Sequence, residues 1–477
     1  MSSSASHRFD TRIKDLKNRA LKAAARHEWA GTLLSQLLDL PKELIPGKKP
    51  TMRCCIYKER AIMTERVRLA LGGDANRPNV VEVIDIACDD CPQGGCTVSD
   101  ACRGCLAHWC EGACPRGAIS FGPDQKAVID KSRCINCGKC AAACPYSAIV
   151  DRKRPCEKAC KLGAISAAED GSARIDDDKC ISCGACVYQC PFGAISDKSA
   201  VVNVVDMLKE SQSPSGGAAH VHAIVAPAIA GQFAPALTAQ VVTGLLKLGF
   251  HGVYEVALGA DMVAWEESRE LAEKGFLMSS CCPAFVTYVR KNFPALADRL
   301  STSLSPMGVI AKYLKQSDPG CEVVFIGPCI TKKAESRLPA VSPYVNEVLT
   351  FEELQAIFDS RDIDVAALPP PPFRGASCFG RGFARSGGVC EAMQQGLKEH
   401  GIDFAIKPFA ANGIEECRKA LTLVSLGKAD FNFLEGMACP GGCINGPGCM
   451  THSPHHAVDL RDYCADTTVR TIEESRR

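Results

Sequence analysis

The sequence predicts an α/β domain with mainly parallel sheets in the C-terminal half, preceded by small α+β modules. Two observations predict this order. Among 477 residues there are thirty cysteines, and a dense run of them at short, repeated spacings lies between residues 88 and 190. Beyond residue 220, short β-rich runs alternate with amphipathic helical segments, which favours parallel strands joined by helices. The chain length is consistent with two or three domains.

The N-terminal region carries apolar residues at helical spacing among charges from about residue 8 to residue 40, so a helical extension is expected there. After the cysteine-dense region, AVVNVVDMLKE predicts one helix, and SQSPSGGAAH is typical of a linker. We divide the chain into a helical extension (1–80), cysteine-rich modules (81–198), a linker (199–220), the larger domain (221–455) and a C-terminal tail (456–477).

In the larger domain, four runs are expected to contain strands: VHAIVAP, GVYEVALG, EVVFIGP and ADFNFLEG. Helices are expected at PALTAQVVTGLLKLGF and ADMVAWEESRELAEK. The uncharged stretch 223–246 is long enough to suggest a membrane span, but Pro227 and Pro235 interrupt it, together with two glutamines. A buried strand, a loop and a helix fit this stretch better.

Charge and the N-terminus restrict the partners and the compartment. The 55 basic and 54 acidic residues give a net charge of +1, which offers no reason to expect nucleic acid or a membrane as partner. The first residues lack the apolar core of a secretory signal, so a cytoplasmic location is expected. In that reducing compartment disulfides are disfavoured, and metal binding is the better interpretation of so many cysteines.

An internal repeat organises the cysteine-rich modules. Cys114, Cys144, Cys160 and Cys190 are each followed, four and five residues later, by Ala-Ile. The repeat implies four half-modules.

Two cysteine runs have the spacing Cys-x2-Cys-x2-Cys-x3-Cys-Pro, in which short loops bring successive thiolates onto the corners of an iron–sulfur cubane and the fourth thiolate serves a neighbouring cluster. A third run is a two-residue expansion of the same pattern. The three resemble the runs of two-cluster bacterial ferredoxins, and this resemblance implies crossed ligation in the first pair. One cluster would use Cys102, Cys105, Cys110 and Cys144, and the other Cys134, Cys137, Cys140 and Cys114.

The fourth half-module is incomplete, because no Cys-x2-Cys motif immediately precedes Cys156 and Cys160. Cys88 and Cys91 offer the missing pair from upstream. Four accessory clusters would result, but three remain an open alternative, and zinc also accepts four thiolates. Cys54, Cys55 and Cys96 have no assigned partner. The two proposed ligand sets are Cys88, Cys91, Cys156 with Cys190, and Cys180, Cys183, Cys186 with Cys160.

Three segments of the larger domain resemble, in order, the signatures of the [FeFe]-hydrogenase catalytic domain: SSCCP (279–283), GPCITKKAE (327–335) and EGMACPGGC (435–443). Gly327, Ala228 and Met307 depart from the usual residues. With these departures and the unusual cysteine-rich modules, the chain resembles the monomeric, group B-like branch of the family.

The resemblance implies a cofactor and its ligands. Cys282, Cys329, Cys439 and Cys443 would bind a [4Fe-4S] cubane, and Cys443 would also bridge to a di-iron subcluster that carries CO, cyanide and an azadithiolate. Lys332 is the expected donor to cyanide. Met437 would pack beside the di-iron unit, and Ala226 with Pro227 would form a wall with backbone donation near it. The alternative for these cysteines is a place in the core, and for Lys332 a solvated position.

The resemblance also implies a proton path, because a buried iron site cannot draw protons directly from bulk water. Cys281 would be the last relay, followed by Glu267, Ser301 and Glu270. The two glutamates are three residues apart on an expected helix, so their carboxylates can share one face. A solvated helix face is the alternative interpretation.

The family implies an enzyme that interconverts H2 with protons and electrons, with ferredoxin or a similar low-potential carrier as partner and with maturation proteins that supply the di-iron unit. An iron–sulfur assembly or scaffold protein of the hydrogenase-like family is a second hypothesis, and a hydrogen sensor is a third. The direction of the reaction is not fixed by the sequence, because ferredoxin-type clusters span a wide potential range.

Overall fold

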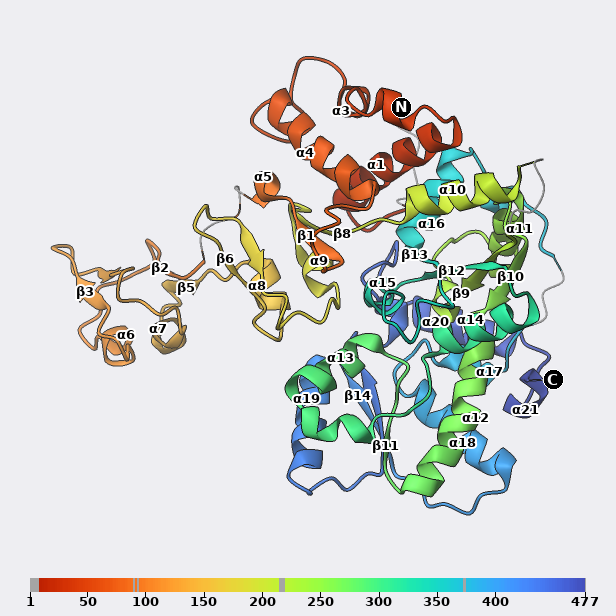
Figure 1. Ribbon diagram of the computed structural model, residues 1–477. Helices are drawn as coiled ribbons and strands as arrows, with labels where there is room; N and C mark the ends of the chain where they lie inside the picture. The colour runs from red at the N-terminus through yellow and green to blue at the C-terminus, as the bar shows by residue number, and fades with distance from the viewer. Residues whose placement is uncertain (1–7, 89–90, 92–93, 214–218, 372–374, 477) are drawn as a thin grey trace.

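The computed structural model describes residues 8–88, 91, 94–213, 219–371 and 375–476 (Figure 1). Part of the expected linker and the first residues of the helical extension lie outside this range. In Figure 1 the cysteine-rich modules form an arm that extends from a larger body, and the N-terminal helices lie across the top of that body. No helix of the described residues is long and apolar enough to cross a bilayer.

The N-terminal extension is helical, as the periodicity predicts. It contains α1 (Arg12–Trp29), α2 (Leu33–Gln36), α3 (Leu40–Leu44) and α4 (Ile56–Ala70). Helix α1 begins where the Thr11 hydroxyl accepts the Lys14 amide, and its alanine-rich face packs against α16 (Phe351–Ser360) and α10 (Val201–Ser211). The extension is thus part of the same core as the body.

The cysteine-rich arm holds two modules, one nested inside the other. The inner module pairs β2 (Cys96–Val98) with β5 (Ile149–Asp151) and β3 (Ile119–Phe121) with β4 (Ala127–Ile129), all antiparallel, and adds α6 (Trp109–Gly112) and α7 (Lys139–Ala143). The outer module begins before it and ends after it. Its elements are β1 (Val81–Val83), α5 (Asp85–Cys88), α8 (Pro155–Ala159), β6 (Ile165–Ala167), β7 (Ala173–Ile175), α9 (Ala185–Gln189) and β8 (Ile195–Asp197).

Strand β1 pairs antiparallel with β8, across the whole inner module. The upstream segment that carries Cys88 and Cys91 therefore belongs to the module that is completed only after residue 155.

The segment assigned as a linker contains α10, whose Val201, Val204, Val205 and Leu208 are fully buried in the main core. The stretch 214–218 lies outside the described residues. Helix α10 packs on α1 and α16, so residues 201–211 connect the arm to the body through a packed element.

The body contains two all-parallel sheets, which confirms the expected fold class. One has the order β10 (Gly252–Glu255), β9 (Val221–Val225), β12 (Glu322–Gly327) and β13 (Glu347–Thr350). The other has the order β11 (Leu277–Met278), β15 (Phe433–Met437) and β14 (Pro408–Asn412). Of the expected strand GVYEVALG only the first four residues are β structure, because Val256 already begins α12 (Val256–Lys274).

Helices cover both sheets. Around the four-stranded sheet are η1 (Pro227–Ile229), α11 (Thr238–Leu248), α14 (Pro306–Ser317), α15 (Thr331–Glu335), α16 and η3 (Val365–Ala367). The remaining elements are α13 (Pro283–Asn292), η2 (Pro294–Arg299), α17 (Cys378–Gly382), α18 (Gly388–His400), α19 (Ile414–Ser425), η4 (Cys443–Asn445), α20 (His456–Ala465) and α21 (Ile472–Ser475).

Candidate active site

One cavity lies where four parallel strands end. Ala226 and Pro227 follow β9, Cys329 follows β12, and Met437 closes β15, while Cys281 and Cys282 follow β11. The carboxyl ends of parallel strands meet at one edge of a sheet, so side chains from distant segments converge there. The structure brings all these predicted residues to the wall of one cavity, together with Lys332, Cys439 and Cys443.

The four predicted ligand cysteines surround this cavity. Burial, and then the neighbouring Cys282, raises the pKa of the Cys329 thiol to about 11, although the Lys332 ammonium lowers it. Burial, followed by Cys329 and Cys282, likewise raises the pKa of Cys443. Four thiolates crowded in an apolar space repel each other unless a cationic centre joins them, so the donor set fits an iron–sulfur cubane.

Lys332 carries the one charge among the described residues that line this cavity. It is buried, and its Nζ donates to Ser305 Oγ at 2.7 Å and forms an ion pair of 2.7 Å with Glu335 on the same helix turn. Although burial lowers the pKa of Lys332, Glu335 and Cys329 raise it overall. The lysine is therefore a charged group in an otherwise apolar cavity, and not a solvated residue.

The wall formed by Ala226 and Pro227 is apolar in character. The Ala226 N–H donates to the Ile326 carbonyl at 2.8 Å within the sheet, and proline has no N–H, so neither residue has a backbone donor left for the cavity. Packing explains the glycine at position 327, because a Cβ there would lie 2.5 Å from the ring of Phe325, which lines the cavity. Met307 is fully buried in the same wall.

Cys281 lines the cavity, and its thiol interacts with the carboxylate of Glu267. Burial raises the pKa of the Cys281 thiol well above its usual value, and the carboxylates of Glu435 and Glu267 contribute to the rise. Glu267 is fully buried on α12, and its Oε1 accepts from the Ser280 amide at 3.2 Å and the Ser280 hydroxyl at 2.8 Å. Burial raises the pKa of Glu267 to about 7, although hydrogen bonds from Ser280 and Ser301 lower it.

The Ser301 hydroxyl donates to Glu270 Oε2 at 3.0 Å, and Ser301 also lowers the pKa of Glu267. Burial raises the pKa of Glu270, but hydrogen bonds from Lys274 and Thr302 outweigh it and lower the pKa overall. Ser301 and Thr302 line a surface groove. The structure thus places Cys281 at the cavity, Glu267 buried on α12, and the Ser301–Glu270 pair next to the groove, and their order as a relay stays a prediction.

Ser280 is a residue that sequence reasoning left without a role. It belongs to the SSCCP motif, and its amide and its hydroxyl both donate to the Glu267 carboxylate. Glu335, three residues after Lys332, likewise pairs with the cavity lysine, and its i, i+3 spacing could have indicated this.

In the inner module of the arm, the thiols gather as two groups. Cys114, Cys134, Cys137 and Cys140 line one small cavity. Cys110 interacts with Cys105 and Cys144, and burial followed by these thiols raises its pKa. The grouping agrees with the crossed arrangement, although Cys96, which had no assigned partner, also lines the first cavity beside Cys140.

In the outer module, the thiols of Cys88 and Cys91 interact with Cys190, and Cys156 interacts with both Cys88 and Cys190. Cys186 interacts with Cys183, Cys180 and Cys160. These are the two sets that the sequence suggested. Their identity as metal ligands stays a prediction.

The Ala-Ile repeat has a structural cause that the spacing alone did not show. In each half-module the backbone N–H of the alanine donates to the sulfur of the cysteine four residues earlier, at 3.2–3.4 Å. Such hydrogen bonds favour the thiolate, the form that binds metal. The repeat therefore positions each sulfur and also supplies a packed side chain beside it. The four alanines, all buried, are Ala118, Ala148, Ala164 and Ala194.

The arm meets the body at Cys183. This residue lines the cavity at the strand ends, and its thiol interacts with Cys282. Next to it, the Thr331 hydroxyl donates to the Ser182 carbonyl at 3.0 Å. One cysteine set of the outer module therefore lies directly beside the set in the body.

Comparison with known proteins shows which families parts of the chain resemble. The family model described as "Iron only hydrogenase large subunit, C-terminal domain" matches residues 219–447, a "4Fe-4S dicluster domain" matches 101–148, and a "4Fe-4S binding domain" matches 173–196. The matched ranges contain the cavity cysteines and most of the arm.

Similar curated proteins include hydrogenases and cluster-assembly factors. The large subunit of the periplasmic [Fe] hydrogenase of Nitratidesulfovibrio vulgaris is 28% identical over 261 residues, covering 44% of this chain and 62% of that protein. The cytosolic Fe-S cluster assembly factor NAR1 of Eremothecium gossypii is 26% identical over 278 residues, covering 44% and 62%. The chain thus spans less than two thirds of the length of these relatives. A solved structure of the [FeFe]-hydrogenase HydA1 from Chlamydomonas reinhardtii aligns at 23% identity with a TM-score of 0.47, over 57% of this chain and 92% of that one.

Proposed function

Because the chain is an [FeFe]-hydrogenase-like iron–sulfur protein, we propose that it interconverts H2 with two protons and two electrons. The observation that carries this proposal is the placement of Cys281 at the cavity wall, Glu267 buried on α12, and Ser301 hydrogen-bonded to Glu270 next to the surface groove. These residues would carry protons between the four-cysteine cavity and the groove. A protein that only holds a cubane has no need of a proton path.

The residues that would hold the catalytic cofactor are Cys282, Cys329, Cys439 and Cys443 for the [4Fe-4S] cubane, with Cys443 shared with the di-iron subcluster. When bound, the di-iron unit with its CO, cyanide and azadithiolate ligands supplies the site at which H2 is formed or split. The chain's own residues exclude water, since the cavity wall is almost entirely apolar. Lys332 provides the positive charge that an anionic cyanide requires there.

Proton transfer is assigned to side chains in series. The Cys281 thiol holds the proton at Sγ beside the cavity, and Glu267 exchanges it at a carboxylate whose pKa of about 7 suits both uptake and release near neutral pH. The Ser301 hydroxyl passes it to Glu270, which is reached from the groove that Thr302 lines. Ser280 positions Glu267 in this series.

Electrons would travel along the arm. The set around Cys183 lies beside the cavity, and the inner module lies farthest from the body (Figure 1). We assign three or four accessory [4Fe-4S] clusters to the arm and a cytoplasmic ferredoxin, or a similar low-potential carrier, as the partner at its far end. Maturation proteins would insert the di-iron unit.

The relatives include assembly factors, so a cluster-assembly role is the second candidate. The experiment that separates the two is infrared spectroscopy of the chain matured anaerobically, combined with a hydrogen assay using reduced viologen. We expect bands of metal-bound CO and cyanide that respond to H2. Absence of these bands, when a known hydrogenase matured in parallel shows them, would reject the enzyme and favour assembly.

A further inference from the structure

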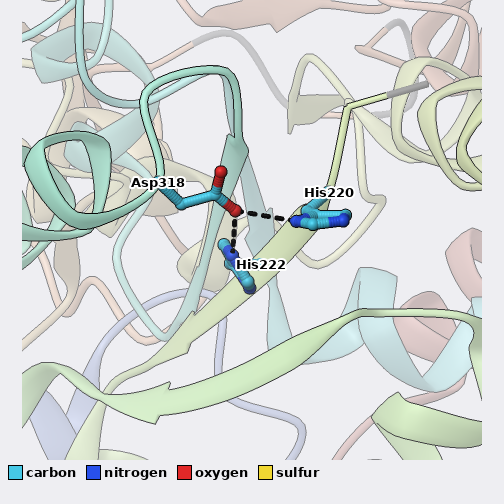
Figure 2. Close-up of side chains that lie close together, drawn as sticks. All are labelled: His220, His222 and Asp318. Carbon is cyan, nitrogen blue, oxygen red and sulfur yellow. Dashed lines mark hydrogen bonds and ion pairs between the residues drawn. The ribbon is translucent and has the colours of Figure 1, made fainter. Parts of the chain in front are cut away.

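Two histidines and an aspartate converge at the amino ends of the two central strands of the body's four-stranded sheet, away from the cysteine cavity. Figure 2 shows the rings of His220 and His222 and the carboxylate of Asp318 turned toward one another. His220 Nδ1 lies 2.8 Å from Asp318 Oδ2, and His222 Nε2 lies 3.2 Å from the same oxygen. The three potential ligand atoms lie within 4.8 Å of one another.

Strand geometry brings the histidines together. His220 and His222 flank Val221, the first residue of β9, so their side chains point to the same side of the strand. Asp318 comes from the loop that follows α14 and precedes β12, the neighbour of β9. A third ring, that of His251, stacks on His220 with centroids 3.8 Å apart, and packs edge-on to His222.

The donor types and spacing suit a divalent transition-metal ion. Two imidazoles and one carboxylate are ligands that zinc accepts. Atoms bound at about 2.0–2.1 Å to a tetrahedral ion lie roughly 3.3 Å apart, and the His222 to Asp318 separation of 3.2 Å is close to this value. The His220 to Asp318 separation of 2.8 Å is about half an ångström shorter than this value.

Burial differs among the three ligands in a way that suits a site at the rim of the fold. The His222 side chain is 6% exposed, whereas the side chains of His220 and Asp318 are 50% and 38% exposed. The buried ring is positioned by the sheet, because a Cβ at Gly252 would lie 2.9 Å from His222 Nδ1 and 3.1 Å from the Tyr254 hydroxyl. An ion can reach the other two ligands from solvent, and a water molecule can complete its coordination.

The cluster lies at the opposite end of the sheet from the cavity. It is at the amino ends of β9 and β12, whereas Ala226 and Cys329 follow the carboxyl ends of the same strands. No described residue of the cluster lines the cavity. Its ligands contain no sulfur, so its preference differs from that of the cysteine sets, which suit iron–sulfur clusters.

We propose that His220, His222 and Asp318 form a mononuclear site for a zinc-class divalent ion, which joins the start of β9 to the loop before β12. The bound ion replaces the two N–H···O contacts with three coordination bonds and fixes the amino edge of the sheet. This proposal is independent of hydrogen turnover, because neither the ligands nor the readout involves the iron sites.

The test uses the full chain with its iron–sulfur clusters in place, exposed to Zn²⁺ anaerobically and then passed through a desalting column. We expect one zinc more per chain in the wild type than in the variant His220→Asn/Asp318→Asn. Both residues are partly exposed, so the variant should fold. His455→Asn, a change at an exposed histidine outside the cluster, should retain the zinc.

Zinc-edge X-ray absorption then separates this site from adventitious thiol binding. The expected shell holds only nitrogen and oxygen at about 2.0–2.1 Å. Sulfur at about 2.3 Å, or equal zinc content in the wild type and the double variant, would overturn the proposal.

Discussion

The ammonium of Lys333 lies 2.7 Å from the carboxylate of Asp197, and this buried pair ties the helix after Cys329 to the last strand of the arm. The same Nζ lies 2.8 Å from Glu353 and donates to the Lys198 carbonyl at 2.6 Å. Lys332 and Lys333 are neighbours in the chain, yet the first faces the cavity and the second holds the arm against the body.

Lys333→Met should destabilise the protein by about 3–5 kcal/mol, because it leaves the buried Glu353 without its cation and leaves Asp197 with Lys17 alone. Lys42→Met is the matched control: its ion pair with Asp39 is exposed on both sides, and its loss should cost less than ~1 kcal/mol. Anaerobic urea denaturation measures both. Similar midpoints for the two variants would contradict the role assigned to Lys333.

Replacing Cys281 and Cys443 should give two different losses. Cys281→Ala should retain the cofactor bands in the infrared spectrum but lose about 10²-fold or more in turnover, because the proton donor beside the cavity is gone. Cys443→Ala should lose the cofactor itself. Cys321→Ala, at a buried cysteine before β12, serves as the control and should change neither the cofactor bands nor the turnover. Loss of the cofactor in both Cys281→Ala and Cys443→Ala would reject this division of roles.

Proton reduction should slow as the pH rises through about 7, because the protonated Glu267 is the donor and its pKa is raised to about that value. Glu267→Gln keeps the shape but cannot release a proton, so we expect a loss of about 10²–10⁴-fold in rate and no inflection near pH 7. Glu266→Gln, one residue earlier and exposed, should behave as the wild type. A Glu267→Gln variant with the wild-type pH profile would remove Glu267 from the path.

The number of clusters can be counted from iron. Four accessory cubanes and the catalytic cubane predict about 20 iron atoms after reconstitution, and about 22 once the di-iron unit is inserted. The double variant Cys88→Ala/Cys91→Ala should lose about four of them, whereas Cys54→Ala/Cys55→Ala should lose none. A wild-type plateau near 16 would favour three accessory clusters and another role for Cys88 and Cys91.

The cysteine chemistry was determined by the sequence itself, because a run such as Cys180 to Cys190 closes its metal-binding loop within eleven residues. Local spacing is enough to bring sulfurs together there. The same holds for the parallel sheets, whose alternation of strand and helix patterns is local, and for α1 with its periodic apolar face.

Tertiary structure decided the contacts between segments far apart in the chain. The pairing of β1 with β8, which nests one module inside the other, spans more than a hundred residues. Lys333 with Asp197, and Asp318 with His222, are contacts across 136 and 96 positions. No local pattern specifies such partners, because they meet only when the sheets and the arm pack, and packing then makes buried charges pair and polar rings converge.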